Sequence, residues 1–209
     1  MLRSLMPCGV RVLDVGCGTG SVTVIANSGK GNEIVAIEPD EVRAAVARSR
    51  GLEVQESLLD ANFMQGREAF DVVMASDVLE HVAAPAELLN LMVRAAKPGG
   101  MLLISVPNVA HWSVRLNLLF GRFDLEPDGI MDATHLRWFT ARTVRDLIEG
   151  TDCQIASLQQ TAGASLPVYH RGLLGRVPKA SRAWAVRILT RLLPRLMGVQ
   201  HVLVVHTPS

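Results

Sequence analysis

The sequence predicts an α/β fold in which a doubly wound, seven-stranded sheet carries helices on both faces. Seven short apolar runs rich in β-branched residues alternate with helix-like stretches, a pattern typical of such sheets. A glycine-rich turn follows the first run, where sheets of this kind bind their ligands. With 209 residues, 49% of them hydrophobic, the chain is long enough for a single domain with a substantial core.

The elements follow in order from these runs. We expect strands at 11–15, 33–38, 53–56, 71–75, 101–105, 153–159 and 200–206. We expect helices at 20–28, 40–50, 85–96, 140–149 and 179–197. Asp40 and Thr140 have the side chains of N-caps, and Gly150 and Gly198 are expected helix stops. Pro194 lies inside the last predicted helix and should kink or end it.

Cysteine usage and hydropathy exclude several classes of protein. Cys8, Cys17 and Cys153 form no Cys-x-x-Cys pair, so we expect neither a disulfide framework nor a metal site. A reducing cytoplasm fits this usage best. The N-terminus lacks the apolar core of a secretory signal, and no run of about 18 uncharged apolar residues predicts a membrane span.

The C-terminal part of the chain is strongly basic. Residues 171–198 contain seven arginine and lysine residues and no acidic residue, although the whole chain is near neutral at +1. Arg187, Arg191 and Arg195 recur at every fourth position and form one stripe of a helix. This helix either covers the sheet with a solvated basic edge, or it also contacts anionic lipid at the inner membrane face or a phosphate-bearing substrate.

The glycine turn predicts the charge of its ligand. The run 12–20 reads Val-Leu-Asp-Val-Gly-Cys-Gly-Thr-Gly, and Gly16 and Gly18 allow the backbone to approach a ligand closely. In a dinucleotide-binding fingerprint the third glycine would fall at Ser21, and Asp14 would lie poorly beside a pyrophosphate. A nucleotide-like ligand that carries an ammonium or sulfonium group suits this carboxylate.

These residues resemble the class I S-adenosylmethionine-dependent methyltransferases. The run 12–20 is similar to their first motif, and the likeness continues through 34–38, through Phe-Asp-Val-Val-Met-Ala-Ser-Asp-Val-Leu-Glu-His at 70–81, and through 97–108. The stretch 121–140 resembles a small-molecule branch associated with bacterial cell-surface glycan and lipid-linked biosynthesis. The resemblance implies S-adenosylmethionine as cofactor and a Rossmann-like sheet whose last strand is antiparallel.

The cofactor residues are expected at the carboxyl ends of the first four strands. Glu38 ends the second strand, where a carboxylate can accept both ribose hydroxyls, unless it is an ordinary strand-end charge. Asp14 is either a buried turn residue or the group that orders the glycine loop and the methionine ammonium. We expect the cofactor to contact Asp14, Gly16, Cys17, Gly18, Glu38, Ser57, Ser76 and Asp77.

Three histidines are candidates for a general base. His81 ends the motif at 70–81 and is either a base or a hydrogen-bonding residue at a helix entry. His111 and His135 lie in the segment 108–139, which holds five of the nine aromatic residues and is expected to form a lid-like insertion, with Asp132 orienting His135. Only about ten residues precede the first strand, so we expect this segment or a second subunit to cover the site. An amine nucleophile would need no base.

The sequence thus favours methyl transfer to a small molecule, through an oxygen of a sugar, a phenol or quinone-like ring, or a lipid-linked acceptor. A noncatalytic cofactor-binding scaffold is the alternative from another class. An RNA methyltransferase is disfavoured, because Ser-Asp-Val-Leu at 76–79 replaces the Asn/Asp-Pro-Pro-aromatic signature of base-amino methylation. We therefore expect no nucleic-acid partner.

Overall fold

The computed structural model describes residues 1–60, 62–170 and 176–209, and within them seven strands form one sheet in the order β3-β2-β1-β4-β5-β7-β6. The strands are β1 (Arg11–Val15), β2 (Glu33–Ile37), β3 (Glu53–Gln55), β4 (Phe70–Ser76), β5 (Ala96–Pro107), β6 (Gln154–Ala162) and β7 (Gly198–His206). Strands β1 to β5 pair in parallel, whereas β7 is antiparallel to both β5 and β6. The predicted fold class, with its antiparallel last strand, is confirmed.

The helices are α1 (Leu2–Leu5), α2 (Ser21–Asn27), α3 (Glu41–Ser49), α4 (Pro85–Ala95), α5 (Trp112–Leu119), α6 (Ala141–Glu149), α8 (Lys179–Leu192) and α9 (Pro194–Met197), with 3₁₀ turns η1 (Leu79–His81) and η2 (Pro167–Tyr169). They include five at predicted positions, α2, α3, α4, α6 and α8, whereas α1 and α5 were not predicted. Asp40 caps α3 by accepting from the backbone N–H of Arg43, and Thr140 forms a capping box at α6. Pro194 separates α8 from α9, as its missing N–H predicts.

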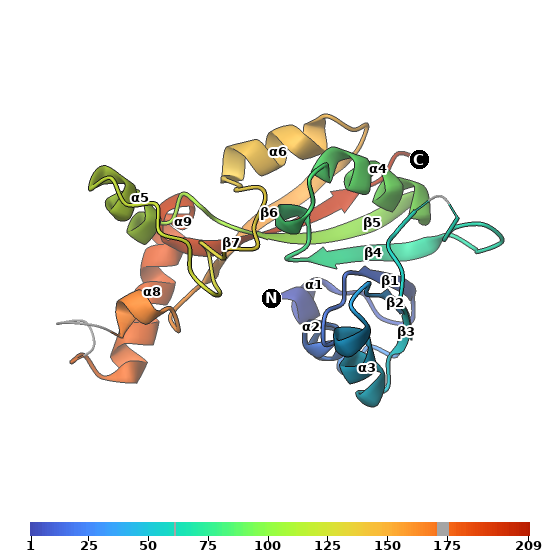
Figure 1. Ribbon diagram of the computed structural model, residues 1–209, viewed down its shortest axis with the longest axis horizontal. Helices are drawn as coiled ribbons and strands as arrows, with labels where there is room; N and C mark the ends of the chain where they lie inside the picture. Colours follow the sequence, from blue (N-terminus) through green and yellow to red (C-terminus); the bar gives the residue numbers. More distant parts are fainter. Residues whose placement is uncertain (61, 171–175) are drawn as a thin grey trace.

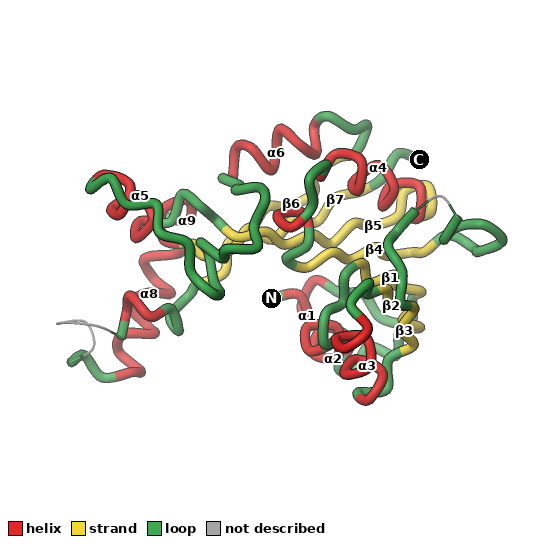
Figure 2. The backbone as a smooth tube through the Cα atoms, viewed as in Figure 1, coloured by secondary structure: helices red, strands yellow, loops and turns green. Residues whose placement is uncertain are grey.

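Helices cover both faces of the sheet. Figure 1 and Figure 2 show α4 and α6 on one face, and α1, α2 and α3 on the other. Leu89 of α4 and Ile148 of α6 are fully buried against the first face, and Met6 and Ala26 pack against the second. Because both faces are buried, the ends of the strands are the places where polar side chains gather.

The sheet places the site at the carboxyl ends of the parallel strands. Strand β1 pairs with β2 on one side and with β4 on the other, so the order of strands reverses between β1 and β4. Ligands of doubly wound sheets bind in the crevice outside this reversal. The glycine turn after β1, Glu38 after β2 and Asp77 after β4 therefore lie around one crevice.

Helices α5, α8 and α9 gather at one end of the molecule, beyond β6 and β7 (Figure 1). Their small core contains Tyr169, Val186 and Met197, with Trp112 packed against it. The sequence did not predict α5, because its leucines fall on several sides and give no helical period; they are Leu116, Leu118 and Leu119, all exposed.

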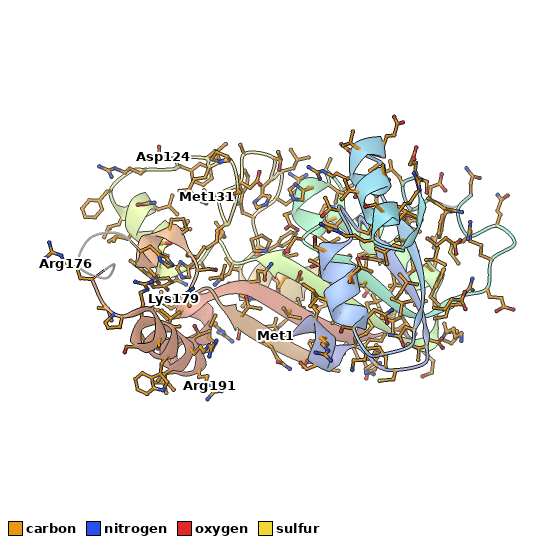
Figure 3. All side chains as sticks on the ribbon, turned by 90° about the horizontal axis from the view of Figure 1, so that it is seen from below. Met1, Asp124, Met131, Arg176, Lys179 and Arg191 are labelled. Carbon is orange, nitrogen blue, oxygen red and sulfur yellow. The ribbon has the colours of Figure 1, made fainter. Side chains whose placement is uncertain are left out.

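The predicted basic stripe is solvent-exposed, but Pro194 divides it between α8, which carries Arg187 and Arg191, and α9, which carries Arg195. Arg187, Arg191 and Arg195 are exposed, and Figure 3 shows Arg191 at the outer edge of the molecule. Leu192 and Trp184 on the same helix are 70% and 66% exposed. Within the described part of the chain, no helix has the length and hydrophobicity to cross a membrane.

Candidate functional site

The glycine turn is fixed by the end of β2. The backbone N–H groups of Gly16 and Cys17 both donate to the carbonyl of Ile37, at 2.9 and 3.0 Å. Gly16 and Gly18 have φ of +66° and +56°, which side-chain-bearing residues adopt with strain. A Cβ on Gly16 would lie 2.9 Å from a methyl group of Val78, whereas Gly18 faces open space. The backbone at Gly18 is therefore accessible to a ligand.

Glu38 lies directly beneath this turn. It is 5% exposed, its Oε2 accepts from the backbone N–H of Gly18 at 2.8 Å, and its Oε1 accepts from that of Asp40 at 3.1 Å. A carboxylate has about four lone-pair sites, so each oxygen can still accept a ribose hydroxyl. Glu38 thus orders the glycine turn in addition to its predicted role.

Asp14 contacts a different element from the one expected. It is 2% exposed and accepts a hydrogen bond from the hydroxyl of Thr23 in α2. Burial, together with the nearby charge of Glu38, raises the pKa of Asp14 to about 7, although the Thr23 hydrogen bond opposes this. The glycine loop is held by hydrogen bonds to Ile37 and Glu38. A cation beside Asp14 would favour its charged form.

Cys17 and Ser57 differ in what they offer a ligand. Cys17 packs its side chain with Ala36, Ala44 and Val54, and burial raises the pKa of its thiol to about 12. Cys17 therefore has an unreactive side chain. Ser57 follows β3 beside a cavity of about 390 Å³, and its buried Oγ has no hydrogen-bond partner among the described residues. An adenine at the predicted position would give this hydroxyl a partner.

Asp77 has a strained backbone at the end of β4. Its φ of +56° is unusual for a residue with a side chain, and such strain concentrates at functional sites. Gln200 Nε2 donates to both oxygens of Asp77, at 2.9 and 2.7 Å, and the Ser105 hydroxyl donates at 3.3 Å. Burial raises the pKa of Asp77 despite these bonds. Ser76 contacts Ser105 Oγ at 2.9 Å.

Glu80, His81 and His135 form a cluster beside Asp77. One potential ligand atom of each side chain lies within 4.8 Å of the others, and the two imidazole rings meet edge to face. Glu80 is 1% exposed, and neither carboxylate oxygen has a hydrogen-bond partner in the described part of the chain. Burial and the charge of Asp77 raise the pKa of Glu80 to about 8. The sequence named both histidines but missed Glu80, because nothing in the pattern shows that this glutamate is buried.

The segment between α5 and α6 holds this cluster together. The backbone N–H groups of Leu136 and Arg137 donate to the carbonyl of Glu80 at 2.8 and 3.0 Å. Nδ1 of His81 lies 3.3 Å from the carbonyl of Thr134. The Thr134 hydroxyl also lies 3.2 Å from this nitrogen and donates to Asp132 at 2.7 Å.

Asp132 acts on His81 through Thr134, and its charge also acts on His135, which we expected it to orient. Its carboxylate also accepts from the backbone N–H of Thr134 at 2.7 Å. These two bonds with Thr134 hold the pKa of Asp132 below its usual range. Burial lowers the pKa of His135, which is 7% exposed.

His111 lies outside this cluster and is completely buried. Its Nδ1 lies 2.8 Å from Ser113 Oγ, and its Nε2 lies 3.2 Å from the hydroxyl of Tyr169, which also accepts from Trp112. Burial lowers the pKa of His111 to about 4. Because both ring nitrogens have partners, the structure favours a packing role, and a role as base stays a prediction.

A cavity of about 550 Å³ lies beside α5. It is lined mainly by α5, residues 126–131 and residues 166–168. Ile130 and Met131 belong to this lining and precede His135 of the cluster by five and four residues. The segment between α5 and α6 therefore contributes to both the cavity and the cluster.

Sequence comparison agrees with this geometry. A family model described as methyltransferase domain matches residues 5–158. The ubiquinone biosynthesis O-methyltransferase of Hahella chejuensis is 37% identical over 112 residues, which are 51% of this chain and 46% of that protein. That of Azotobacter vinelandii is 37% identical over 48% of this chain and 45% of the relative. The chain spans about half the length of these curated relatives.

Solved structures share the fold at low sequence identity. A SAM-dependent methyltransferase from Archaeoglobus fulgidus has a TM-score of 0.60 and 20% identity, with 96% of this chain and 86% of that chain covered. An S-adenosylmethionine-dependent methyltransferase from Mesorhizobium loti has a TM-score of 0.61 and 17% identity, covering 98% and 95%. The open backbone at Gly18, the buried Glu38 and the unpartnered Ser57 hydroxyl fit S-adenosylmethionine. The chain belongs to the methyltransferase-domain family and is an S-adenosylmethionine-dependent methyltransferase domain.

Proposed function

We propose that the protein transfers a methyl group from S-adenosylmethionine to an oxygen of a small-molecule acceptor. The observation that carries this proposal is the position of His81 and His135 beside Asp77, at the crevice formed by the glycine turn. His81 lies four residues after Asp77 in the turn that follows β4, and a ligand atom of His135 lies within 4.8 Å of those of Glu80 and His81. Groups that can receive a proton therefore lie at the edge of the cofactor crevice, where a hydroxyl nucleophile needs one.

The reaction requires positioning more than covalent chemistry. The bound cofactor supplies an electrophilic methyl group on a sulfonium, and the acceptor oxygen must lie opposite the S–C bond. The proton of the acceptor hydroxyl passes to His81 or His135. The Nδ1 of His81 faces the carbonyl of Thr134, which can only accept, so the proton of the neutral ring lies there and Nε2 keeps its lone pair.

The acceptor belongs to one of three classes: a phenol or quinone-like ring, a sugar, or a lipid-linked molecule. Trp112, Ile130 and Pro167 give the cavity of about 550 Å³ apolar walls that suit a ring or an acyl or prenyl chain. The ubiquinone biosynthesis O-methyltransferases are the relatives that favour a ring over a sugar. They match only half of this chain, so the ring is the first acceptor class to test.

We also infer that α8 contacts anionic lipid, which would place the protein at the inner membrane face. Exposed Trp184 and Leu192 lie on the same helix as the exposed Arg187 and Arg191. An interfacial helix combines such apolar and basic residues, since the former enter the acyl boundary and the latter meet lipid phosphates. Contact with a membrane would bring a lipid-linked or quinone-like acceptor to the cavity beside α5.

Two measurements on the full chain test the proposed function. Calorimetry with S-adenosylhomocysteine should give micromolar binding that Glu38→Ala weakens by about 100-fold, since hydrogen bonds to charged groups contribute about 1.5–3 kcal/mol each. Glu41→Ala, on the exposed side of α3, is the matched control. An assay of S-adenosylhomocysteine release with phenol, quinol and sugar acceptors should identify turnover.

Each measurement can overturn a different part of the proposal. Failure of a folded parent to bind S-adenosylhomocysteine would contradict the cofactor assignment. Binding without turnover on any acceptor, with or without added membrane, would favour the noncatalytic scaffold.

A further inference from the structure

We infer that Glu80, His81 and His135 bind a divalent metal ion at the carboxyl edge of the sheet. One potential ligand atom of each side chain lies within 4.8 Å of the others. The 3₁₀ turn η1 supplies Glu80 and His81, and the segment after α5 supplies His135. The sequence predicted no metal, because His135 lies 54 positions after His81 and only the contact between the two segments brings it to Glu80 and His81.

The carboxylate of Glu80 needs a partner that the described residues do not supply. Its side chain is 1% exposed, and both oxygens lie buried without a hydrogen bond to any described residue. Buried carboxylates in proteins are usually paired with a cation, hydrogen-bonded or bound to a metal. A divalent cation at the cluster would give the two oxygens that partner.

His81 has the hydrogen bond typical of a metal ligand. Its Nδ1–H faces the carbonyl of Thr134 at 3.3 Å, which leaves Nε2 free to coordinate. His135 is buried at the same cluster, with its ring edge to face against that of His81. Metal-binding histidines usually donate their second N–H to a carbonyl or carboxylate, which fixes the ring and its tautomer. Asp132 supports this arrangement by accepting from Thr134 at 2.7 Å.

The donor set indicates the class of ion. Two imidazoles and one carboxylate suit Zn²⁺, Fe²⁺ or Mn²⁺, and three protein ligands leave coordination positions open, as in catalytic sites. Donors about 2.1 Å from a tetrahedral ion lie about 3.4 Å apart, so donor atoms that are now up to 4.8 Å apart have to approach one another by up to about 1.4 Å. His81 is exposed and can rotate to do so, while Glu80 and His135 are held by the interior.

The role of the ion rests on the proposed function. The hydroxyl of the acceptor would occupy an open position and release its proton to solvent, because coordination to a divalent ion lowers the pKa of a bound hydroxyl. The O–C bond then forms as the S–C bond of S-adenosylmethionine breaks, with the electron pair returning to sulfur. The bound ion then takes over the part that His81 or His135 plays in the ion-free protein, where one of these rings receives the proton directly.

Metal binding can be measured without turnover. The full chain, treated with a chelator and dialysed, is titrated with Mn²⁺ and followed by electron paramagnetic resonance. We expect one Mn²⁺ per chain, with affinity reduced at least tenfold in Glu80→Gln and His135→Gln. Glu87→Gln and His206→Gln, two exposed positions, are the matched controls and should bind as the parent does. Binding of S-adenosylhomocysteine by every variant reports an intact fold.

The outcomes separate the metal site from the proposed function. If a parent that binds S-adenosylhomocysteine binds neither Mn²⁺ nor Zn²⁺, or if Glu80→Gln binds Mn²⁺ equally well, the site is wrong and the proposed function stands. If metal binds as expected but methyl transfer persists undiminished in a chelator, the role of the ion in the reaction is wrong. If metal binds and no acceptor is methylated, only the proposed function is contradicted.

Discussion

Gln200 of β7 holds the carboxylate of Asp77 with two hydrogen bonds, at 2.9 and 2.7 Å, across 123 positions of sequence. Among the described residues, Asp77 alone has a positive φ without being a glycine. It directly follows β4, at the cofactor crevice. The antiparallel strand β7 thus fixes a strained residue of the parallel part of the sheet. The last strand therefore contributes to the site as well as to the core.

Replacing Gln200 with leucine should destabilise the protein by about 1–3 kcal/mol, because a buried carboxylate loses its amide donor. Urea denaturation measures this loss. Gln159→Leu, at an exposed position of β6, is the control and should change stability by less than about 0.5 kcal/mol. Equal effects of the two substitutions would show that the Asp77–Gln200 pair has no special importance.

Replacing Gly20 with alanine should destabilise the fold more than Gly29→Ala. Both glycines have positive φ, at +75° and +72°, so each variant gains about 1–2 kcal/mol of backbone strain. At Gly20 the added Cβ would also lie 2.5 Å from Leu52 and 3.1 Å from Ala47, whereas Gly29 meets only a flexible arginine end at 3.7 Å. Thermal unfolding should separate the two variants by several degrees. Coincident melting curves would contradict close packing of the turn on α3.

Asp14→Asn should become more stable than the parent as pH rises. The pKa of Asp14 is 3.8 for an ordinary aspartate, as in the unfolded chain, and about 7 in the folded protein, so the folded state binds more protons between these values. Stability of the parent therefore falls as pH rises from about 4 to 7 and levels off above, at up to about 1.4 kcal/mol per pKa unit. The asparagine variant lacks this loss.

Urea denaturation at pH 4.5 and pH 8 measures the free energy of unfolding of the parent and of Asp14→Asn. Two other titratable groups interact with Asp14: the charge of Glu38 raises the pKa of Asp14, and the charge of Asp14 raises the pKa of the Cys17 thiol. Thr23 is the hydrogen-bond donor to Asp14. Asp152→Asn, on an exposed turn, is the control. An advantage of Asp14→Asn that does not grow with pH would show that Asp14 is ionised in the folded state.

Replacing Arg187, Arg191 and Arg195 together with glutamine should weaken adsorption to vesicles that contain phosphatidylserine. Each basic side chain near an anionic surface contributes about 1 kcal/mol, so we expect a loss of at least tenfold in a sedimentation assay. Replacing Arg142, Arg145 and Arg94 with glutamine is the control. It tests whether exposed arginines outside α8 and α9 contribute equally to vesicle adsorption. No adsorption of the parent at low salt would remove the membrane proposal.

The sequence by itself determined the sheet and the cofactor turn. Alternating β-branched runs and caps such as Asp40 and Thr140 are local signals, because strand and helix formation depend on neighbours a few residues away. The motif at 12–20 and Glu38 were likewise readable, since the distance from turn to carboxylate is set within one βαβ unit. Helix α5 was missed because its exposed leucines follow no helical period.

Only the tertiary structure decided the chemistry around the acceptor. Glu80 and His135 meet because the backbone of 136–137 donates to the Glu80 carbonyl, and Gln200 reaches Asp77 because β7 pairs with β5. The sequence offered His111 as a candidate base alongside His81 and His135, but both of its ring nitrogens are occupied, by Ser113 and by Tyr169. The burial of Glu80, its unpartnered oxygens and the tautomer of His81 all depend on contacts between segments that are distant in sequence. The local sequence around each residue carries no signal for such contacts.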